Sequence, residues 1–428
     1  MINAIPFAAM VVALLLGVPI AVALAGSGIL GIWLVKGDWN IVIGVLKTAP
    51  LTAADYNLTT IPMFILMAYL SSASGLASDL YTAAARWLSH FRGGLAMATV
   101  FACAVFGALC GGSVAAAAVM SNIAYPNMRR LGYSEVLSAG VVGVGSTIVI
   151  LIPPSVPMVI YGIVTETSIG KLLIAGVFPG ILLGICLILC IVIWVRVNPS
   201  HAPKAQSATW AERWSSLRGI WPSISLIIII LVVLYTGIAT PTEVGAVGAA
   251  AAAFIGIIMR RLTWKGILDA VVDTVSASTM IFLIIIGATI FGSYMTMSRI
   301  PQDLAAAVTA MNINRWLIII AITVGYFIIS MFMDEIPLLL LTLPVTFPLV
   351  IHVGFDPIWF GVLSILMVCM GLVFPPVGLV AFVVSATTHV PLVTVYRGTS
   401  ILICAIFLAF ILVMIFPQIA LWLPATMR

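Results

Sequence analysis

Two proline pairs are the residues of this sequence best placed to create a binding site. Pro153-Pro154 and Pro375-Pro376 each interrupt a long apolar stretch, and the second pair follows the first by 222 positions. Proline lacks the N–H group that would bond to the carbonyl of the residue four positions earlier, so each pair should break an α-helix. The carbonyl oxygens freed in this way could bind a small hard cation such as Na⁺. These oxygens belong to Val149, Ile150, Gly371 and Leu372.

The same offset relates other residues that shape the backbone. It pairs Pro19 with Pro241, Pro126 with Pro348, and Gly26, Gly44, Gly132 and Gly176 with Gly248, Gly266, Gly354 and Gly398. Chance would align roughly 0.6 proline pairs at one offset, whereas four are present. The sequence therefore predicts an internal duplication.

The composition is that of a polytopic helical membrane protein. Hydrophobic residues make up 63% of the chain and charged residues 7%, compared with about a quarter charged in soluble domains. About a dozen continuous apolar stretches predict an all-α fold, because barrel strands would alternate at a period of two. The six cysteines lie in apolar segments without CxxC spacing, and HExxH and P-loop motifs are absent, so we expect no enzyme.

The first re-entrant hairpin is predicted over about 95–128. Arg86 and Arg92 precede this segment and Arg129-Arg130 follow it, so the positive-inside rule places both of its ends in the cytoplasm. A straight helix of this length would measure about 51 Å, too long for a hydrocarbon core of about 30 Å. We therefore expect the chain to turn back at Gly111-Gly112, near the middle of the membrane.

A second hairpin over about 316–350, with its tip at Met333-Asp334-Glu335, should enter from the opposite face. On this topology twelve Lys and Arg residues are cytoplasmic and six are periplasmic, and both termini are periplasmic. The prediction is an inverted repeat with two re-entrant hairpins and two Pro-Pro broken helices, over 136–165 and 358–386. The expected domains are residues 1–195, a cytoplasmic connector 196–219, and residues 220–428. Segments 38–57 and 262–275 are expected to be paired interfacial helices.

Each predicted break lies opposite a hairpin tip, which favours cation sites over kinks repaired by hydroxyl groups or water. The first tip offers Gly111, Gly112 and Ser113. At the second tip, Asp334 could ligate a cation or accept hydrogen bonds from helix N-terminal amides, and both acids would be merely solvated if the tip reached water. Glu243 could instead cap the helix that it opens.

The chain resembles the large membrane subunit of tripartite ATP-independent periplasmic (TRAP) transporters, within the ion transporter superfamily. The motifs that carry the resemblance begin at Leu16 (LGVPIAVAL), Gly111 (GGSVA), Leu151 (LIPPS), Phe355 (FDPIWFG) and Pro375 (PPVG). Related chains more often have a Ser-Gly-Ser-like first tip, so residues 111–113 depart from the family pattern.

The resemblance implies a Na⁺-coupled importer of organic anions, such as carboxylates, dicarboxylates or sialic acid, in the bacterial inner membrane. It implies an elevator motion, a small four-helix membrane subunit and a periplasmic substrate-binding protein. It places Na⁺ between each tip and its break, which adds Ile152, Pro154, Phe374 and Pro376 to the candidate ligands. The candidate substrate contacts are Ser155, Arg299 and Glu243.

Two other functions agree less well with the sequence. A stand-alone Na⁺/carboxylate symporter of the same superfamily would work without a binding protein, and co-purification of a small subunit would separate the two cases. A channel would need a continuous polar pore, which so apolar a chain does not offer.

Overall fold

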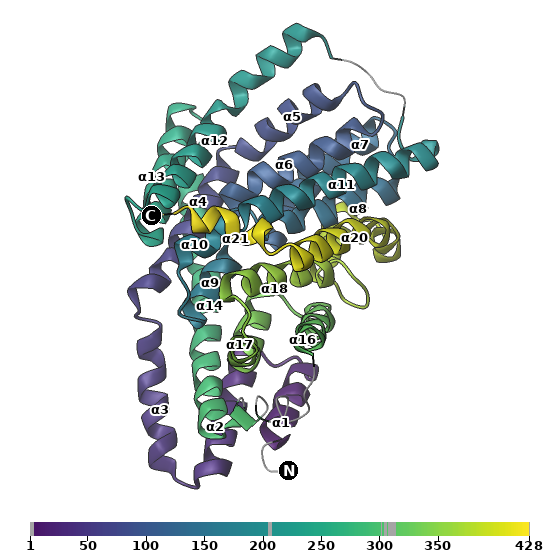
Figure 1. The fold of residues 1–428 in the computed structure, drawn as a ribbon. Helices are drawn as coiled ribbons and strands as arrows, with labels where there is room; N and C mark the ends of the chain where they lie inside the picture. Colours follow the sequence, from purple (N-terminus) through teal and green to yellow (C-terminus); the bar gives the residue numbers. More distant parts are fainter. Residues whose placement is uncertain (1–3, 204–207, 301, 304–305, 307–313, 428) are drawn as a thin grey trace.

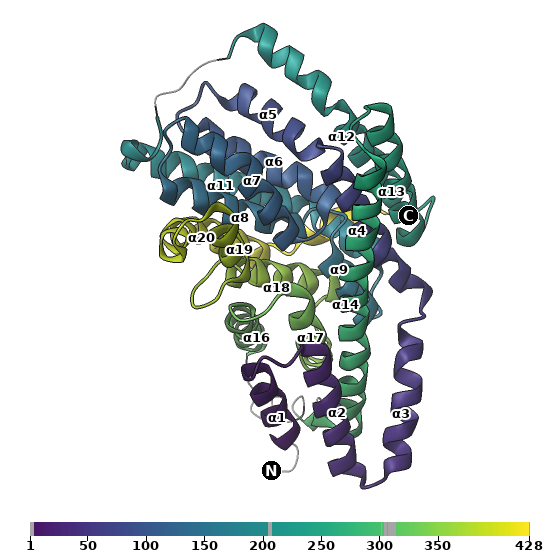
Figure 2. The ribbon, with the colours of Figure 1, turned by 180° about the vertical axis from the view of Figure 1, so that it is seen from behind.

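A computed structural model describes residues 4–203, 208–300, 302–303, 306 and 314–427, and this part of the chain contains helices and no strands. Helices α5, α6, α7, α11 and α12 gather at one end of the molecule, and α1, α2, α3 and the lower part of α14 at the other (Figures 1 and 2). The first-half helices are α1 (Ala4–Leu15), α2 (Ile20–Lys36), α3 (Trp39–Thr52), η1 (Tyr56–Thr59), α4 (Thr60–Ala73), α5 (Leu76–Leu88), α6 (Gly94–Cys110), α7 (Ser113–Arg130), α8 (Glu135–Thr147), η2 (Ile148–Ile150), α9 (Val156–Val164), α10 (Ile169–Ala175), α11 (Val177–Val197) and η3 (Pro199–His201). Those of the second half are α12 (Trp210–Thr236), α13 (Pro241–Ile258), α14 (Trp264–Met297), α16 (Arg315–Ser330), α17 (Glu335–His352), α18 (Pro357–Gly371), α19 (Leu379–Thr388), α20 (Leu392–Ile415) and α21 (Gln418–Ala425).

Six of the described helices are long and apolar enough to cross a membrane, or seven if the bent pair α4 and α5 counts as one span. Many of the remaining apolar helices are shorter because they belong to hairpins or broken helices. The predicted hairpins are formed by α6 with α7 and by α16 with α17. The predicted breaks separate α8 and η2 from α9, and α18 from α19.

The inverted repeat is visible in the helix boundaries and in the packing. Helices α7 and α17 have 18 residues each and begin at Ser113 and Glu335, the residues that the offset of 222 relates. Helix α2 packs along α14, and their counterparts α13 and α4 pack together in the same way. This contact between the two halves therefore occurs twice, with the roles of the halves exchanged.

One predicted pair of elements is wrong. Segment 38–57 contains α3 as a separate helix, but segment 262–275 is the first part of α14, which continues unbroken for 34 residues. Pro50 lies near the end of α3 and Asp55 caps a new 3₁₀-helix, whereas α14 contains no proline. The first half is thus interrupted where the second half is continuous.

The predicted connector 196–219 contains the beginning of a long helix. Helix α12 starts at Trp210 behind a capping box of Thr209 and Glu212, and it continues past the expected boundary. The Trp87 indole N–H donates to the Arg213 carbonyl at 3.2 Å, so this end of α12 packs against α5. Lys204, counted among the cytoplasmic residues, and Arg428, counted among the periplasmic ones, lie outside the described residues.

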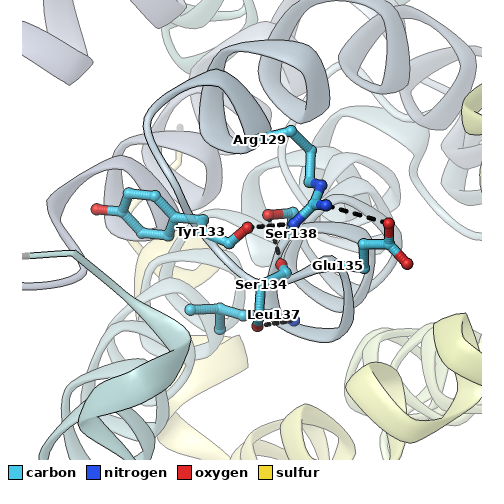
Figure 3. A network of polar contacts seen from close by, with 6 residues as sticks. All are labelled: Arg129, Tyr133, Ser134, Glu135, Leu137 and Ser138. Carbon is cyan, nitrogen blue, oxygen red and sulfur yellow. Dashed lines mark hydrogen bonds and ion pairs between the residues drawn. The ribbon is translucent and has the colours of Figure 1, made fainter.

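A polar network holds the outer end of the first hairpin (Figure 3). The Arg129 guanidinium donates to the Tyr133 carbonyl at 2.6 Å and to the Glu135 carboxylate at 3.1 Å. The Ser134 hydroxyl caps α8 by accepting from the N–H of Leu137 at 3.2 Å. These contacts fix the angle between α7 and α8, and with it the position of the hairpin relative to the first broken helix.

Glycine allows the closest approach between the two halves, where α8 crosses α20. A Cβ atom on Gly140 would lie 2.5 Å from the carbonyl carbon of Gly398, and one on Gly398 would lie 2.1 Å from the Val136 oxygen. Because backbone meets backbone here, no flexible side chain can move aside.

We therefore expect Gly398→Ala to lower the free energy of unfolding by about 1–3 kcal/mol, measured as a lower melting temperature in detergent. Gly184→Ala on α11 is the matched control, because nothing lies within 4 Å of its new Cβ atom. The control should be neutral or slightly stabilising, since alanine favours a helix over glycine. Equal effects of the two substitutions would contradict the close crossing.

Candidate functional site

The first helix break covers residues 151–155, between η2 and α9, and its Pro153-Pro154 peptide bond is cis. Ser155 is buried and caps α9, accepting from the N–H of Met158 at 3.4 Å. The same hydroxyl donates to the Ile150 carbonyl at 2.6 Å. One of the carbonyls expected to be free thus already has a donor. Ser155 therefore stabilises the backbone of the break, by bonding to Ile150 and capping α9.

The second break covers residues 372–378 and has the same form, with a cis bond at Pro375-Pro376. The carbonyl of Gly371 accepts from the N–H of Phe374 at 3.1 Å, and that of Leu372 from the N–H of Val380 at 3.0 Å. Hydroxyl groups on α20 serve two more carbonyls: Thr399 donates to Val373 at 2.9 Å and Tyr396 donates to Pro376 at 3.0 Å. Side-chain hydroxyl groups were the alternative to a cation at the breaks. At both breaks they donate some of the hydrogen bonds that the backbone carbonyls accept.

Each hairpin tip docks on the break in its own half. The N–H of Val156 donates to the Gly111 carbonyl at 3.2 Å, and the N–H of Gly378 donates to the Met331 carbonyl at 2.9 Å. The two donors are counterparts under the offset of 222. Gly111 has a φ of +67°, and a Cβ atom there would lie 3.0 Å from the Pro154 carbonyl oxygen. A glycine at this position permits both the backbone turn and the close contact.

The two tips meet each other at Ser113 and Glu335. The Ser113 hydroxyl lies 3.1 Å and 3.0 Å from the two carboxylate oxygens of Glu335, and the Ser113 N–H lies 3.4 Å from one of them. Both residues are buried. Cys369 and the carbonyl of Thr147, also 222 positions apart, are in contact at 3.2 Å. The axis that relates the halves therefore passes between the tips and between the broken helices.

Glu335 is the site residue that sequence reasoning missed. The tip acid selected from the sequence was Asp334, which caps α17 by accepting from the N–H of Glu335 at 2.9 Å. Glu335 is the acid that turns inward and bonds to the opposite tip. Its position was available in the sequence, because the offset of 222 pairs it with Ser113.

A cavity of about 420 Å³ lies beside the joined tips. Hairpin residues Gly111, Gly112, Asp334 and Glu335 form one wall, and α4 and α14 form the opposite wall. The remaining lining is mainly apolar. The cavity is thus lined by tip backbone, by the carboxyl groups of Asp334 and Glu335, and by the hydroxyl groups of Tyr69 and Ser72 on α4. Oxygen atoms of these kinds suit a small hard cation.

A second cavity, of about 960 Å³, is related to the first by the repeat. It lies between α17 and α14, where the first lies between α7 and α4. It reaches α17 at Leu340 and Pro344, farther from the tip. Only the smaller of the two cavities therefore contacts both tips.

The other predicted site residues lie elsewhere. Glu243 forms a capping box with Thr240 at the start of α13, which is the structural role considered from the sequence. Arg299 is exposed beyond the end of α14 and lines neither cavity. Val149 packs against Gly107 of α6, and Ile152 packs against Gly180 of α11.

These features define a polytopic helical membrane protein with an inverted repeat, paired hairpins and broken helices. The family model "Tripartite ATP-independent periplasmic transporter, DctM component" matches residues 7–419, and the chain belongs to this family. It is accordingly a multi-pass inner-membrane protein of a transporter family, which confirms the resemblance and the expectation that it is not an enzyme.

Relatives with different named solutes are similar to the chain. It is 36% identical over 375 residues to the C4-dicarboxylate TRAP transporter large permease protein DctM of Pseudomonas aeruginosa, covering 87% of each. It is 32% identical to the ectoine protein TeaC of Halomonas elongata, covering 97% of each, and 31% identical to the sialic acid protein SiaM of Vibrio cholerae, covering 86% of each. The crystal structure of the Alcanivorax borkumensis YdaH transporter, described as having an unusual topology, has the same fold. Its TM-score is 0.64 at 12% identity, over 91% of this chain and 89% of that one.

The contact between the tips can be tested by a double-mutant cycle. We expect Ser113→Ala and Glu335→Gln to be non-additive, with a coupling of about 1 kcal/mol in unfolding free energy, because the two side chains share hydrogen bonds. A parallel cycle of Ser113→Ala with Glu135→Gln, on α8 beyond the far end of the same hairpin, should be additive within about 0.5 kcal/mol. Additivity in both cycles would mean that the tips are not joined in this way.

Proposed function

We propose that this chain is the large membrane subunit of a Na⁺-coupled importer of small organic acids, acting with a small four-helix membrane subunit and a periplasmic binding protein. The observation that carries the proposal is the meeting of two hairpin tips at Ser113 and Glu335, each docked on a broken helix and both lining one cavity. The named solutes of the relatives, C4-dicarboxylates, ectoine and sialic acid, support an organic acid as cargo.

Two Na⁺ ions would be held by oxygen atoms of the tips and breaks. The first site would use residues 111–113 with 150–154, and the second would use Asp334 with residues 372–376. When bound, Na⁺ would supply positive charge beside carbonyl oxygens that already accept one hydrogen bond each and keep a second lone pair for a cation. The Glu335 side chain lies at the meeting of the two tips, so its oxygen atoms would be near both ions.

Transport would proceed by an elevator motion. The hairpins and broken helices form the part that moves, and the α2–α14 and α4–α13 pairs form the scaffold. With the first hairpin entering from the cytoplasm and both termini periplasmic, the cavity at the tips faces the cytoplasm and the larger cavity faces the periplasm. Alternating access would require the tips to be reached from these two cavities in turn and not at once.

Uptake by the reconstituted transporter should depend on a Na⁺ gradient. We expect Ser113→Ala and Asp334→Ala to raise the Na⁺ concentration for half-maximal uptake by about tenfold, because each removes an oxygen ligand or its support. Ser121→Ala, buried on the same hairpin, and Asp356→Ala, which removes the cap of α18, are matched controls. Unchanged Na⁺ activation in both tip variants would refute the assignment.

A small membrane subunit should co-purify with the tagged chain from its native membrane at a constant ratio. This result separates a TRAP system from a stand-alone symporter of the same superfamily. Recovery of the chain alone, together with solute uptake that needs no binding protein, would favour the stand-alone symporter.

A further inference from the structure

A further cavity, of about 340 Å³, lies against the first helix break. Most of its lining comes from α6 and α11, which pack against each other, and α12 adds Ile227 and Leu231. Ile152 and Pro153 of the break also line it, and neither of them lines the other two cavities. This outer cavity therefore reaches the broken helix from a side that the other two do not.

The outer cavity suits hydrocarbon and not water. Every residue that lines it is apolar. Phe101, Ile181 and Ile185 are about half exposed, so the cavity opens on the outside of the protein. Water would find no polar partner there. Inside a membrane, the molecules available to fill such a space are lipid chains, which are as apolar as leucine.

The position of the outer cavity along α11 matches the depth of one leaflet. Gly180 lines the cavity beside the break, where a Cβ atom on it would lie 2.7 Å from the Ile152 side chain. Arg196, near the end of α11, follows Gly180 by 16 residues, which is about 24 Å of helix. One leaflet with its headgroup layer is about 20–22 Å thick. A phospholipid with its phosphate at Arg196 would thus reach the break with the end of its chain.

Two arginines lie together at the headgroup end of α6 and α11. Arg92 precedes α6 and Arg196 belongs to the last turn of α11, and both are exposed. The Arg92 guanidinium donates to the Pro199 carbonyl at 2.8 Å, close behind Arg196 in the chain. Neither arginine forms an ion pair within the described ranges. Basic side chains beside a cytoplasmic leaflet attract anionic lipid headgroups.

We propose that the outer cavity binds an acyl chain of an anionic phospholipid from the cytoplasmic leaflet, with its phosphate at Arg92 and Arg196. The chain would lie against Ile152 and Pro153 and keep water away from the outer side of the first break. The choice of leaflet rests on the predicted topology. The lipid site itself does not depend on Na⁺ coupling.

Gly184 offers a way to fill the outer cavity with a side chain. It lines the cavity, and a Cβ atom on it would meet nothing within 4 Å. Gly184→Leu should therefore take space that the acyl chain needs. Gly325→Leu on α16 is the matched control, because that glycine also has open space around it and does not line the cavity.

Native mass spectrometry of the full chain, purified in mild detergent with any subunit that accompanies it, counts the phospholipids that remain bound. We expect Gly184→Leu to retain one phospholipid fewer than the wild type, and Gly325→Leu to retain the same number. Equal numbers in all three proteins would overturn the proposal.

Thermal stabilisation by added lipid tests the headgroup, with phosphatidylglycerol as the anionic probe and phosphatidylethanolamine as the zwitterionic one. Phosphatidylglycerol should stabilise the wild type at the lower concentration. Arg92→Gln and Arg196→Gln should each raise its half-saturating concentration about fivefold and leave that of phosphatidylethanolamine unchanged. The control Arg130→Gln, which alters an exposed arginine at the end of α7, should change neither.

Equal affinity of the wild type for both lipids, or unchanged phosphatidylglycerol binding in both arginine variants, would reject an anionic lipid. These surface variants leave the cavity intact, so they decide the headgroup even if Gly184→Leu fails to fold. Glycerol 3-phosphate offers the phosphate without acyl chains, and stabilisation by it equal to that by phosphatidylglycerol would indicate a site for soluble anions and overturn the lipid. None of these measurements needs Na⁺ or uptake, so this inference and the proposed function can fail separately.

Discussion

The constraint on which this structure depends is that backbone polar groups must find partners inside an apolar environment. Two proline pairs remove helical hydrogen bonds deep within the protein, and the fold supplies replacements from several directions. Ser155 repairs the first break, Thr399 and Tyr396 repair the second, and the hairpin tips accept N–H groups from both. The hairpins are therefore needed to complete the broken helices, and the broken helices to support the hairpins.

The duplication preserves backbone geometry more strictly than side-chain chemistry. In the first half Gly107 on the hairpin lets α6 approach Val149, whereas in the second half Gly371 on the broken helix lets α18 approach Ser330 of α16. The glycine has changed sides while the close contact has remained. At the tips, the position that is Ser113 in one half is Glu335 in the other, which converts a symmetric position into a donor and acceptor pair.

The features that the sequence predicted well are those that single residues determine locally. Proline pairs interrupt helices, Gly111 permits a left-handed turn, and flanking arginines limit a segment to one side, so both hairpins and both breaks could be located in advance. The continuity of α14 was missed because the match of Gly44 with Gly266 concerns one position only. It carries no information about whether the helix that contains Gly266 continues or ends. The inward turn of Glu335 was missed because only the meeting of the two halves gives that acid a partner. Glu243 and Ser155 were ambiguous for a related reason, since a capping residue and a ligand can have the same type and spacing.

The chain is interrupted between α3 and α4, whereas the corresponding α14 is unbroken, so the two halves differ in stiffness. A continuous helix resists bending along its whole length, whereas a joint at residues 53–55 lets two shorter rods pivot separately. A molecule built from two equivalent halves consequently has one stiff flank and one compliant flank. The two flanks should therefore yield unequally under the same load, and this difference comes from the helices themselves and not from the cavity at the tips.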